Sequence, residues 1–509
     1  MRTKRFLQNL VTSAGGQFLS ILLQFAGRTV FIYTLGAQYL GISGLFTNII
    51  SVLNVTELGL GAAIVYSLYE PLANNDKKKT ASVMQLLRKA YFFVGLFILI
   101  AGIILIPFLP YIMKKTTDLV NIPFVFMLYV MQSVSSYWFY AYKSLIFKAD
   151  QKSYMTNLIT YLANIIGVIV QILILLTTKS FILYTVTGIS INILGNFMIA
   201  GKVDKHYPYL KEKAEPLPKE EQKEIFKSVV GTSVYKVNAV IVRSTDNIII
   251  SAFISTIAVG FYDNYRMITN TLVTFAKMLF GSATAGIGNF VIKEDRKQSE
   301  FLFRVMSVMA FWVYGFCTIC LWVLINPFIS LSWGADYVFG RELVAIIVLD
   351  FMMDGFQTIS IIYKDACGLF WQGKYRPVAT AVLNLMISLA LVKNMGIMGV
   401  VLGTIISRFL TTWWFEPWLV YHNVFKMSCK NYFIRYAMAC IVVLCNIVVI
   451  DFLTVPFSDT TFVNMMVKAV FCFLVPNLTA VLILHRTPEF QYLRDMVMRF
   501  LDKLRGEKV

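Results

Sequence analysis

The sequence predicts an all-α polytopic membrane protein with about fourteen transmembrane helices. We expect two six-helix bundles, related by a pseudo-two-fold axis along the membrane normal, and an added C-terminal helix pair. Three observations support this. Hydrophobic residues make up 58% of the 509 residues and charged residues 15%, with a mean hydropathy of +0.68. Apolar runs of about 20 residues, long enough to span a bilayer, recur along the chain. A polar pattern in the first run returns 219 positions later. The composition excludes a soluble protein.

The predicted spans follow one another through short loops. They cover residues 8–35, 41–68, 84–110, 122–147, 154–176, 181–201, 228–253, 258–288, 302–327, 342–366, 377–393, 397–420, 432–454 and 463–484. The first run holds an arginine and leads to no small-residue cleavage site, so it is expected to remain as a helix and not to be a cleaved signal peptide.

The net charge of +18 is unevenly distributed among the loops. Basic clusters lie at the N-terminus and at residues 77–79, 148–152, 202–227, 293–297, 374–376, 426–430 and 486–508, and the intervening loops carry few. Because cytoplasmic loops are enriched in lysine and arginine, both termini are predicted to be cytoplasmic, which requires an even number of spans. This placement assigns the basic residues to the membrane surface, so we expect no nucleic-acid partner.

The longest polar loop divides the spans into two sets of six. Pro216 and Pro218 interrupt any continuous helix within it. The predicted organisation is an N-terminal bundle at 1–201, a cytoplasmic linker at 202–227, a C-terminal bundle at 228–420, a helix pair at 421–484 and a basic cytoplasmic tail at 485–509.

Two polar stripes repeat between these halves. Their members are spaced by four, seven and four residues, which places them on one side of a helix. The stripes are Ser13, Gln17, Gln24 and Arg28 in the first span and Thr232, Lys236, Arg243 and Asn247 in the seventh. Similar offsets join Gly41 to Gly260 and Asn164 to Asn384. Parallel repeats of this kind are typical of transporters that bind substrate between the halves.

Charged side chains inside a bilayer are costly, so they indicate a protein interior or a wet cavity. The predicted cavity residues are Gln17, Gln24, Arg28, Lys236, Arg243, Asn247 and Arg266. Their excess of positive charge suits an anionic substrate such as a phosphate or pyrophosphate. The alternative for Arg28, Lys236 and Arg243 is a structural ion pair or a snorkelling side chain.

Two further groups of charges have candidate roles. Glu57 aligns one residue from Lys277 at the same offset, and the two are a possible gate pair between the halves. Asp350 and Asp354 lie on one helical face near the middle of the tenth span. Because two neighbouring carboxylates do not both ionise cheaply, they are a possible coupling site for Na⁺ or H⁺. The alternative is that a basic residue of the seventh or eighth span pairs with them.

Enzyme signatures are missing from the sequence. It has no Walker motif, no HExxH and no GxSxG, and no outward loop is large enough for a catalytic domain. We therefore expect neither an enzyme, a metal site nor an organic cofactor.

Three segments carry a family resemblance. They are Gly27-Arg28 followed by residues 35–41 (LGAQYLG), residues 57–63 (ELGLGAA), and residues 396–399 (GIMG) leading to Gly403, Thr404 and Ser407. In these segments the chain resembles the Wzx-type oligosaccharide-lipid flippases. This is the polysaccharide-transport branch of the superfamily that also contains multidrug and toxin extrusion proteins and lipid II flippases.

The resemblance implies a function. Members of this branch move undecaprenyl-pyrophosphate-linked sugar repeat units from the cytoplasmic to the outer leaflet, by alternating access of two six-helix bundles. It implies a cationic central cavity, a bacterial plasma membrane, and a role in capsule, exopolysaccharide or O-antigen synthesis. Expected partners are the lipid-linked oligosaccharide, membrane lipids and other polysaccharide assembly proteins. The extra helix pair is expected to offer a groove for the lipid tail, as in the lipid II flippases.

Alternatives within the superfamily are a lipid II flippase and a multidrug exporter. The basic stripes disfavour an exporter of organic cations. From another class, a membrane glycosyltransferase or polymerase would need a sizeable outward loop with catalytic residues, which the sequence lacks.

Overall fold

The computed structural model describes residues 2–57, 60–114, 121–212, 214–281, 287–288, 290–291, 294–369 and 371–505. Within these ranges it describes no side chains for residues 2–14, 56, 60, 62–63, 228, 230–243, 497 and 499–505. The chain divides into two compact units, Met1–Phe261 and Tyr262–Val509, each of which is described by itself.

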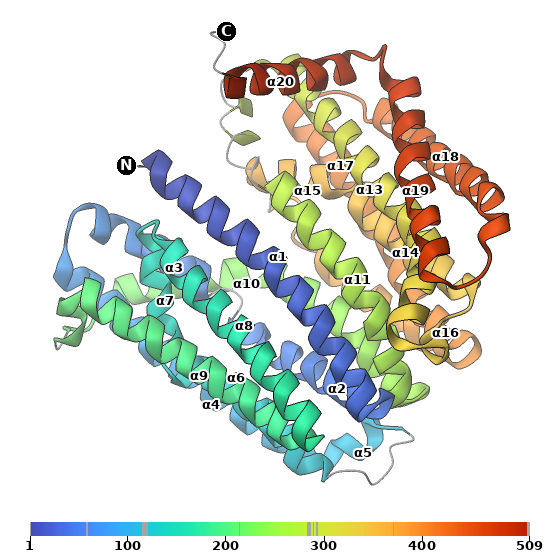
Figure 1. The fold of residues 1–509 in the computed structure, drawn as a ribbon. Helices are drawn as coiled ribbons and strands as arrows, with labels where there is room; N and C mark the ends of the chain where they lie inside the picture. Colours follow the sequence, from blue (N-terminus) through green and yellow to red (C-terminus); the bar gives the residue numbers. More distant parts are fainter. Residues whose placement is uncertain are drawn as a thin grey trace. The chain divides into compact units, whose positions relative to one another are not determined.

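Unit 1 is built of helices, as Figure 1 shows for its blue to green segments. They are α1 (Arg2–Leu35), α2 (Ala37–Leu53), η1 (Asn54–Glu57), α3 (Leu60–Ala73), α4 (Lys77–Leu105), η2 (Ile106–Phe108), α5 (Leu109–Ile112), α6 (Ile122–Trp138), η3 (Ala141–Lys143), α7 (Ser144–Ala149), α8 (Ser153–Thr178), α9 (Phe181–His206), η4 (Pro208–Lys211) and α10 (Lys219–Phe253). Helix α1 packs along α8, α8 against α9, and α6 against both α4 and α9. Helix α10, the predicted seventh span, packs against α2 and α3.

Helix α11 (Thr256–Gly281) begins in unit 1 and continues into unit 2. The remaining helices of unit 2 are α13 (Arg296–Trp333), η5 (Ala335–Tyr337), α14 (Arg341–Phe356), α15 (Thr358–Ala366), α16 (Arg376–Arg408), η6 (Phe409–Trp413), α17 (Phe415–Val420), η7 (Tyr421–Phe425), α18 (Lys430–Leu453), η8 (Val455–Phe457), α19 (Phe462–Leu484) and α20 (Pro488–Arg505). Helix α13 packs against α14, α18, α19 and α20.

Several helices begin where a short polar side chain caps exposed backbone N–H groups. The Asp76 carboxylate accepts from the Lys79 N–H at the start of α4, and Asp295 accepts from Gln298 at the start of α13. The Ser180 hydroxyl does the same for α9. Such caps satisfy donors that have no partner within the helix. The start of α9 coincides with the predicted span start at residue 181, whereas α4 and α13 begin seven and six residues before the spans predicted at 84 and 302.

Two predicted spans are interrupted. The span predicted at 41–68 consists of α2, the 3₁₀ turn η1 and α3, and Asn54 in that turn accepts from the Ser133 hydroxyl of α6 at 2.6 Å. The span predicted at 122–147 bends by 45° between α6 and the segment 141–149, where Tyr140 takes a left-handed conformation. Hydropathy averaged over a whole span gives no sign of these breaks, because the few polar residues at them are outweighed by the apolar helices on either side.

Helix α16 is a hairpin of two spans. Gly396 has φ 60° and ψ −137°, a conformation that breaks the helix and suits glycine. Beyond it the chain runs back along itself, since Asn384 Nδ2 donates to Thr404 Oγ1 at 2.8 Å and Ser388 Oγ donates to the Val400 carbonyl at 3.2 Å. The two spans predicted at 377–393 and 397–420 therefore meet at this glycine.

The described helices confirm the predicted fold class. Nine are long and apolar enough to cross a membrane, and the bent pair α6–α7 adds a tenth. The stretch Arg376–Phe425 counts as one of these nine although it holds the hairpin, and the interrupted α2–α3 span and the long helices α10 and α11 fall outside the count. With these included, the described chain is consistent with about fourteen spans.

A buried carboxylate joins the ends of α15, α16 and α17. Glu416, which is fully buried, receives Arg376 Nη2 at 2.8 Å and Lys364 Nζ at 3.4 Å on its Oε1. Arg376 Nη1 also donates to Thr412 Oγ1 at 2.7 Å. Glu416 lies between two π-helical turns, η6 and η7, which widen the helix on both sides of it. This ion-pair cluster was not predicted from the sequence.

The predicted 219-residue offset also has a structural counterpart. Helices α2 and α11 begin at equivalent positions, Ala37 and Thr256. A Cβ added at Gly260 would lie 2.9 Å from the Gly41 nitrogen and 3.0 Å from the Ala37 carbonyl oxygen, and one added at Gly41 would overlap the Thr256 carbonyl oxygen. Each glycine thus faces the first residue of the other helix. The contact is therefore reciprocal between positions that are 219 residues apart in the sequence.

Candidate functional site

A polar cavity of about 440 Å³ lies inside unit 1 among α1, α2, α6, α8 and α9. Its most characteristic lining groups are carboxamides, contributed by Gln24, Gln132, Asn164, Gln171, Asn192 and Asn196. Hydroxyl-bearing residues complete the polar part of the wall, namely Ser43, Thr47, Tyr129, Thr160, Tyr184 and Thr185. None of the described side chains that line this cavity carries a formal charge. We refer to it as the amide cavity.

The helical repeat of α8 and α9 places these amides on facing surfaces. In α8, Thr160, Asn164 and Gln171 are spaced by four and seven residues, and in α9, Asn192 and Asn196 are spaced by four. Positions with such spacing share one face of a helix. Small residues between them, such as Gly167 and Gly188, leave room for the cavity. The pattern was visible in the sequence, but a search for charged residues passes over it.

Hydrogen bonds orient several of these side chains. Gln171 Nε2 donates to the Tyr184 carbonyl at 3.1 Å, and Asn196 Nδ2 donates to Asn192 Oδ1 at 3.1 Å. The Tyr129 hydroxyl donates to Ser43 Oγ at 2.8 Å. A carboxamide has two donors and an acceptor with two lone pairs, so each retains capacity for a ligand. Such a wall suits a neutral ligand rich in hydroxyl groups.

One described member of the α1 stripe lines this cavity, and two others interact with residues of α8 and α9. Gln24 lines it. Gln17 accepts a long hydrogen bond of 3.5 Å from the hydroxyl of Tyr161 on α8. Arg28 is half-buried and interacts electrostatically with Tyr184, which lines the cavity. The fourth member, Ser13, lies outside the described side chains. Helix α1 therefore presents an amide to the cavity and a guanidinium near its border.

In the second polar stripe, on α10, the structure describes the side chain of the last member, Asn247, alone. The side chains of Thr232, Lys236 and Arg243 lie outside the described residues. Asn247 is 4% exposed and lies beside the buried Asp246 on α10. It does not line the amide cavity. Its predicted place in a substrate cavity, like that of Lys236 and Arg243, stays a prediction.

In unit 2 the predicted carboxylate pair lies beside two arginines. Arg408 Nη1 is 2.7 Å from Asp350 Oδ1 and 3.6 Å from Asp354 Oδ1, and Arg266 Nη1 is 3.9 Å from Asp350 Oδ2. Arg266, a predicted cavity residue in the eighth span, matches the basic partner expected in the alternative interpretation of this pair. The sequence analysis missed Arg408, although an arginine within the predicted 397–420 span was a signal for it. The proposed coupling role of the carboxylates is not tested by this geometry.

The two members of the predicted gate pair have different surroundings. Glu57 lies in η1, where its Oε1 accepts from the Tyr91 hydroxyl at 3.0 Å and its Oε2 from the Tyr137 hydroxyl at 2.7 Å. Lys277 lies on α11, in unit 2. Glu57 therefore has hydrogen-bond partners within its own unit. The gate itself stays a prediction.

Comparison with known proteins identifies the fold. No family model and no curated protein matches the sequence. Among solved structures, the lipid II flippase MurJ in an inward closed conformation is 15% identical, and the alignment covers 97% of this chain and 100% of that one with a TM-score of 0.68. An inward-facing multidrug resistance MATE family transporter of the MOP superfamily is 13% identical over 79% and 95%, with a TM-score of 0.59. The chain therefore has the same fold as these two transporter structures.

A third similar structure is described by the polarity of its binding pocket. It is a MOP superfamily transporter from Pyrococcus furiosus, described by the reverse polarity of its binding pocket. It is 12% identical, and the alignment covers 82% of this chain and 96% of that one with a TM-score of 0.53. At such identities the likeness concerns the fold. The fold alone therefore does not identify the substrate, which depends on the side chains that line the cavities.

Proposed function

We propose that the protein is a flippase that translocates undecaprenyl-pyrophosphate-linked oligosaccharide repeat units from the cytoplasmic to the outer leaflet. The product would serve synthesis of a surface polysaccharide, namely a capsule, an exopolysaccharide or O-antigen. The amide cavity is the observation that carries the proposal. Its volume of about 440 Å³ lies in the usual range for ligand sites. Its neutral carboxamides and hydroxyls match the donors and acceptors of sugar hydroxyl groups.

The absence of charge from the cavity lining argues against an organic cation as the substrate. A buried cation needs a carboxylate or an aromatic cage to offset the loss of water. None of the residues that line the amide cavity is acidic, and its two tyrosines, Tyr129 and Tyr184, do not form a cage. The lining of the cavity in unit 1 therefore disfavours the export of organic cations.

The anionic part of the proposed substrate requires basic side chains. Arg28 at the border of the amide cavity is the described candidate, and Lys236 and Arg243 are the proposed partners from the second stripe. Guanidinium groups bind phosphate oxygens through two parallel hydrogen bonds. We propose that these three residues form the cationic part of the central cavity, while the amide cavity receives sugars.

Coupling is proposed at the carboxylates of unit 2. A proton on Asp350 would remove the charge that holds Arg408 at 2.7 Å. The guanidinium would then be available to an anionic group, so binding of a proton and of a pyrophosphate would favour one another. A Na⁺ ion bound by Asp350 and Asp354 would act in the same direction. In this proposal Arg408 is the residue that links the coupling ion to the substrate.

A lipid II flippase is the second candidate. The observation that favours it is the likeness to the MurJ structure, which extends over 97% of this chain. Both candidates carry a pyrophosphate and sugars, so the amide cavity suits either. The two differ in the phenotype that loss of the gene produces.

The deciding experiment deletes the gene and measures surface polysaccharide and lipid-linked sugars in each leaflet. We expect surface polysaccharide to be lost and lipid-linked repeat units to accumulate in the inner leaflet. Complementation with Gln171→Leu and Asn192→Leu should fail, whereas Ser190→Leu, an exposed position on α9, should restore export. Accumulation of lipid II would favour the second candidate. Normal surface glycan with altered drug sensitivity would contradict the flippase proposal.

A further inference from the structure

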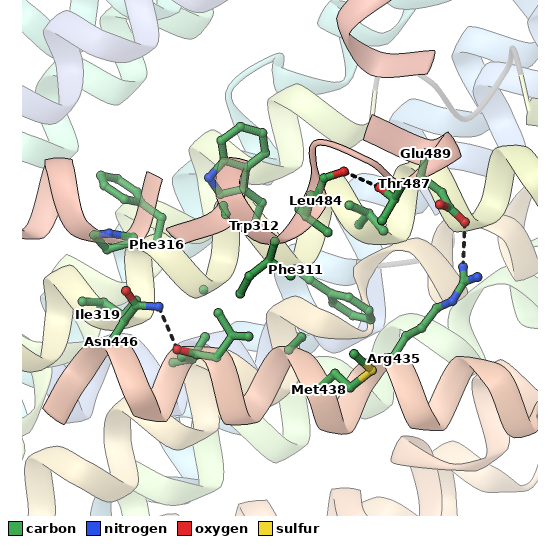
Figure 2. Close-up of a pocket in the computed structure, with 18 residues that line it drawn as sticks. Phe311, Trp312, Phe316, Ile319, Arg435, Met438, Asn446, Leu484, Thr487 and Glu489 are labelled. Atoms are coloured by element: carbon green, nitrogen blue, oxygen red, sulfur yellow. Dashed lines mark hydrogen bonds and ion pairs between the residues drawn. The ribbon is translucent and has the colours of Figure 1, made fainter. Parts of the chain in front are cut away.

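A second cavity lies in unit 2, among α13, α18, α19 and the start of α20. Its volume is about 340 Å³. Apolar side chains form nearly all of its wall, including Phe311, Trp312, Phe316, Met438, Pro476 and Leu484. Figure 2 shows the aromatic and aliphatic groups around it, with Arg435 and Glu489 at one end. The cavity is thus apolar with a charged mouth.

The charged mouth is a carboxylate shared by two arginines. Glu489 Oε1 is 2.9 Å from Arg304 Nη1 and 3.0 Å from Arg435 Nη1. Arg304 also lies 2.8 Å from Glu300 through its Nε. Among the described residues Arg435 pairs with Glu489 alone. If Glu489 withdrew, Arg304 would therefore keep a carboxylate, and Arg435 would be the one left without an anion.

Glu489 belongs to a helix suited to the membrane surface. Helix α20 turns away from the end of α19 (Figure 1). Phe490 packs on Trp312 with ring centroids 6.1 Å apart, and Tyr492 on Phe301 at 5.6 Å. The rest of α20 mixes apolar residues with four basic and two acidic ones, a composition typical of helices that lie in the interface and attract anionic lipids. Glu489 differs from the exposed Asp495 of the same helix, because only 4% of Glu489 is exposed.

We propose that this cavity binds an anionic phospholipid of the cytoplasmic leaflet. One acyl chain fills the apolar space, and the phosphate takes the place of the Glu489 carboxylate on Arg435. The Arg435 side chain is 35% exposed, so it is accessible to a headgroup. The carboxylate of Glu489 thus acts as an internal substitute for a lipid phosphate, and lipid binding releases the start of α20. The proposal does not depend on the transported substrate.

The size of the cavity selects the lipid. A methylene group is similar in size to a water molecule, about 30 Å³, so 340 Å³ holds on the order of ten methylene groups. That is most of one acyl chain but only a small part of an undecaprenyl chain. The basic residues of α20 also favour the anionic cytoplasmic leaflet over zwitterionic lipids. The first consideration favours a phospholipid acyl chain over the undecaprenyl chain, and the second favours an anionic headgroup over a zwitterionic one.

The test measures lipid retained by the purified full-length protein in detergent, by native mass spectrometry. Phosphatidylglycerol, phosphatidylcholine and undecaprenyl phosphate are added separately and in competition. We expect one phosphatidylglycerol bound at least tenfold more tightly than phosphatidylcholine. Arg435→Gln should weaken this binding at least tenfold, and Glu489→Gln should strengthen it, because the competing carboxylate is removed.

Two further variants separate binding from folding. Ala480→Phe should fill the cavity and abolish lipid retention while the thermal unfolding temperature stays within a few degrees of wild type. Lys89→Gln, at an exposed position of α4 away from this cavity, should bind like wild type. Equal retention of phosphatidylcholine, preference for undecaprenyl phosphate, or unchanged binding in both Glu489→Gln and Ala480→Phe would overturn the proposal.

Discussion

Arg408 donates a 2.7 Å hydrogen bond to Asp350, from the returning arm of the α16 hairpin to the middle of α14. Both side chains are largely shielded from solvent, and Asp354 lies 3.6 Å from the same nitrogen. The pair joins two helices that are far apart in the sequence. It therefore bears on both the stability of unit 2 and the proposed coupling of transport.

The energetic link between these two residues can be measured with a double-mutant cycle. Asp350→Asn and Arg408→Gln each leave one charge without its main partner, so both should destabilise the protein. The double variant should lose less unfolding free energy than the sum of the two single losses. The difference, the coupling free energy, should be about 0.5–3 kcal/mol. Chemical unfolding of the purified protein gives this quantity. Strict additivity would show that the hydrogen bond contributes nothing, and transport by each variant tests the coupling role separately.

Arg28 is expected to be needed for export. Arg28→Ala removes the guanidinium at the border of the amide cavity, so the pyrophosphate would lose a charge-assisted partner. Surface polysaccharide should fall to background while the amount of protein in the membrane stays unchanged. Lys89→Ala, at an exposed position of α4, is the matched control. Arg243→Ala should behave like Arg28→Ala, and full export in both variants would remove these residues from the site.

The proposed gate predicts charge rescue. Glu57→Lys should cripple export, since it places two positive charges at the gate, and Lys277→Glu added to it should restore part of the activity. The hydrogen bonds that Tyr91 and Tyr137 donate to Glu57 offer a second explanation for the first effect. Tyr137→Phe distinguishes the two explanations, because it removes a hydrogen bond to Glu57 and leaves the charges of Glu57 and Lys277 intact. If the paired reversal restores nothing in well-expressed protein, the gate is ruled out and the tyrosine contacts account for the loss.

Glu416 should be among the most sensitive positions for stability. Glu416→Ala would leave the half-buried Arg376 and the buried Lys364 without their shared carboxylate, and Lys364 would keep only Asp365, at 3.5 Å. Removal of one partner from a buried ion pair typically costs about 3–5 kcal/mol. The thermal unfolding temperature should fall well below that of Arg494→Ala, which breaks an exposed pair with Asp495. Equal stability of the two variants would contradict a structural role for the Glu416 cluster.

The crossing of α2 and α11 predicts a steep effect of a single methyl group. Gly260→Ala places a Cβ 2.9 Å from the Gly41 nitrogen, where backbone would have to move. Overpacking of this kind costs about 1–3 kcal/mol. Gly281→Ala on the same helix meets nothing within 4 Å and serves as the control. Comparable unfolding midpoints for the two variants would show that the helices separate without cost.

Hydropathy and loop charge were enough to predict the spans, since a bilayer imposes length and polarity on every helix that crosses it. They could not predict the break at η1 or the bend after α6. Those features depend on partners such as Ser133, which lie far away in the sequence. The hairpin at Gly396 fell between two predicted spans, because a glycine there interrupts the apolar run.

The candidate site was predicted less completely. Gln24 and Arg28 were found because their spacing repeats in the seventh span, and Gln24 lines the amide cavity. The amides of α8 and α9 were missed because neutral side chains are tolerated in many membrane helices and so give a weak signal. Arg408 and Glu489 were missed because their roles depend on the residues with which they form ion pairs. Those partners lie on other helices, so the spacing of residues along one helix does not predict them.

The reciprocal contact of Gly41 and Gly260 has a mechanical consequence. It consists of backbone atoms, which have no rotamers to exchange when the helices turn. A small rotation of the start of α11 against α2 about this point would therefore require no repacking of side chains there, whereas the same rotation at an interlocked contact would force several to move. Among the described contacts of unit 1, this crossing has the features of a pivot.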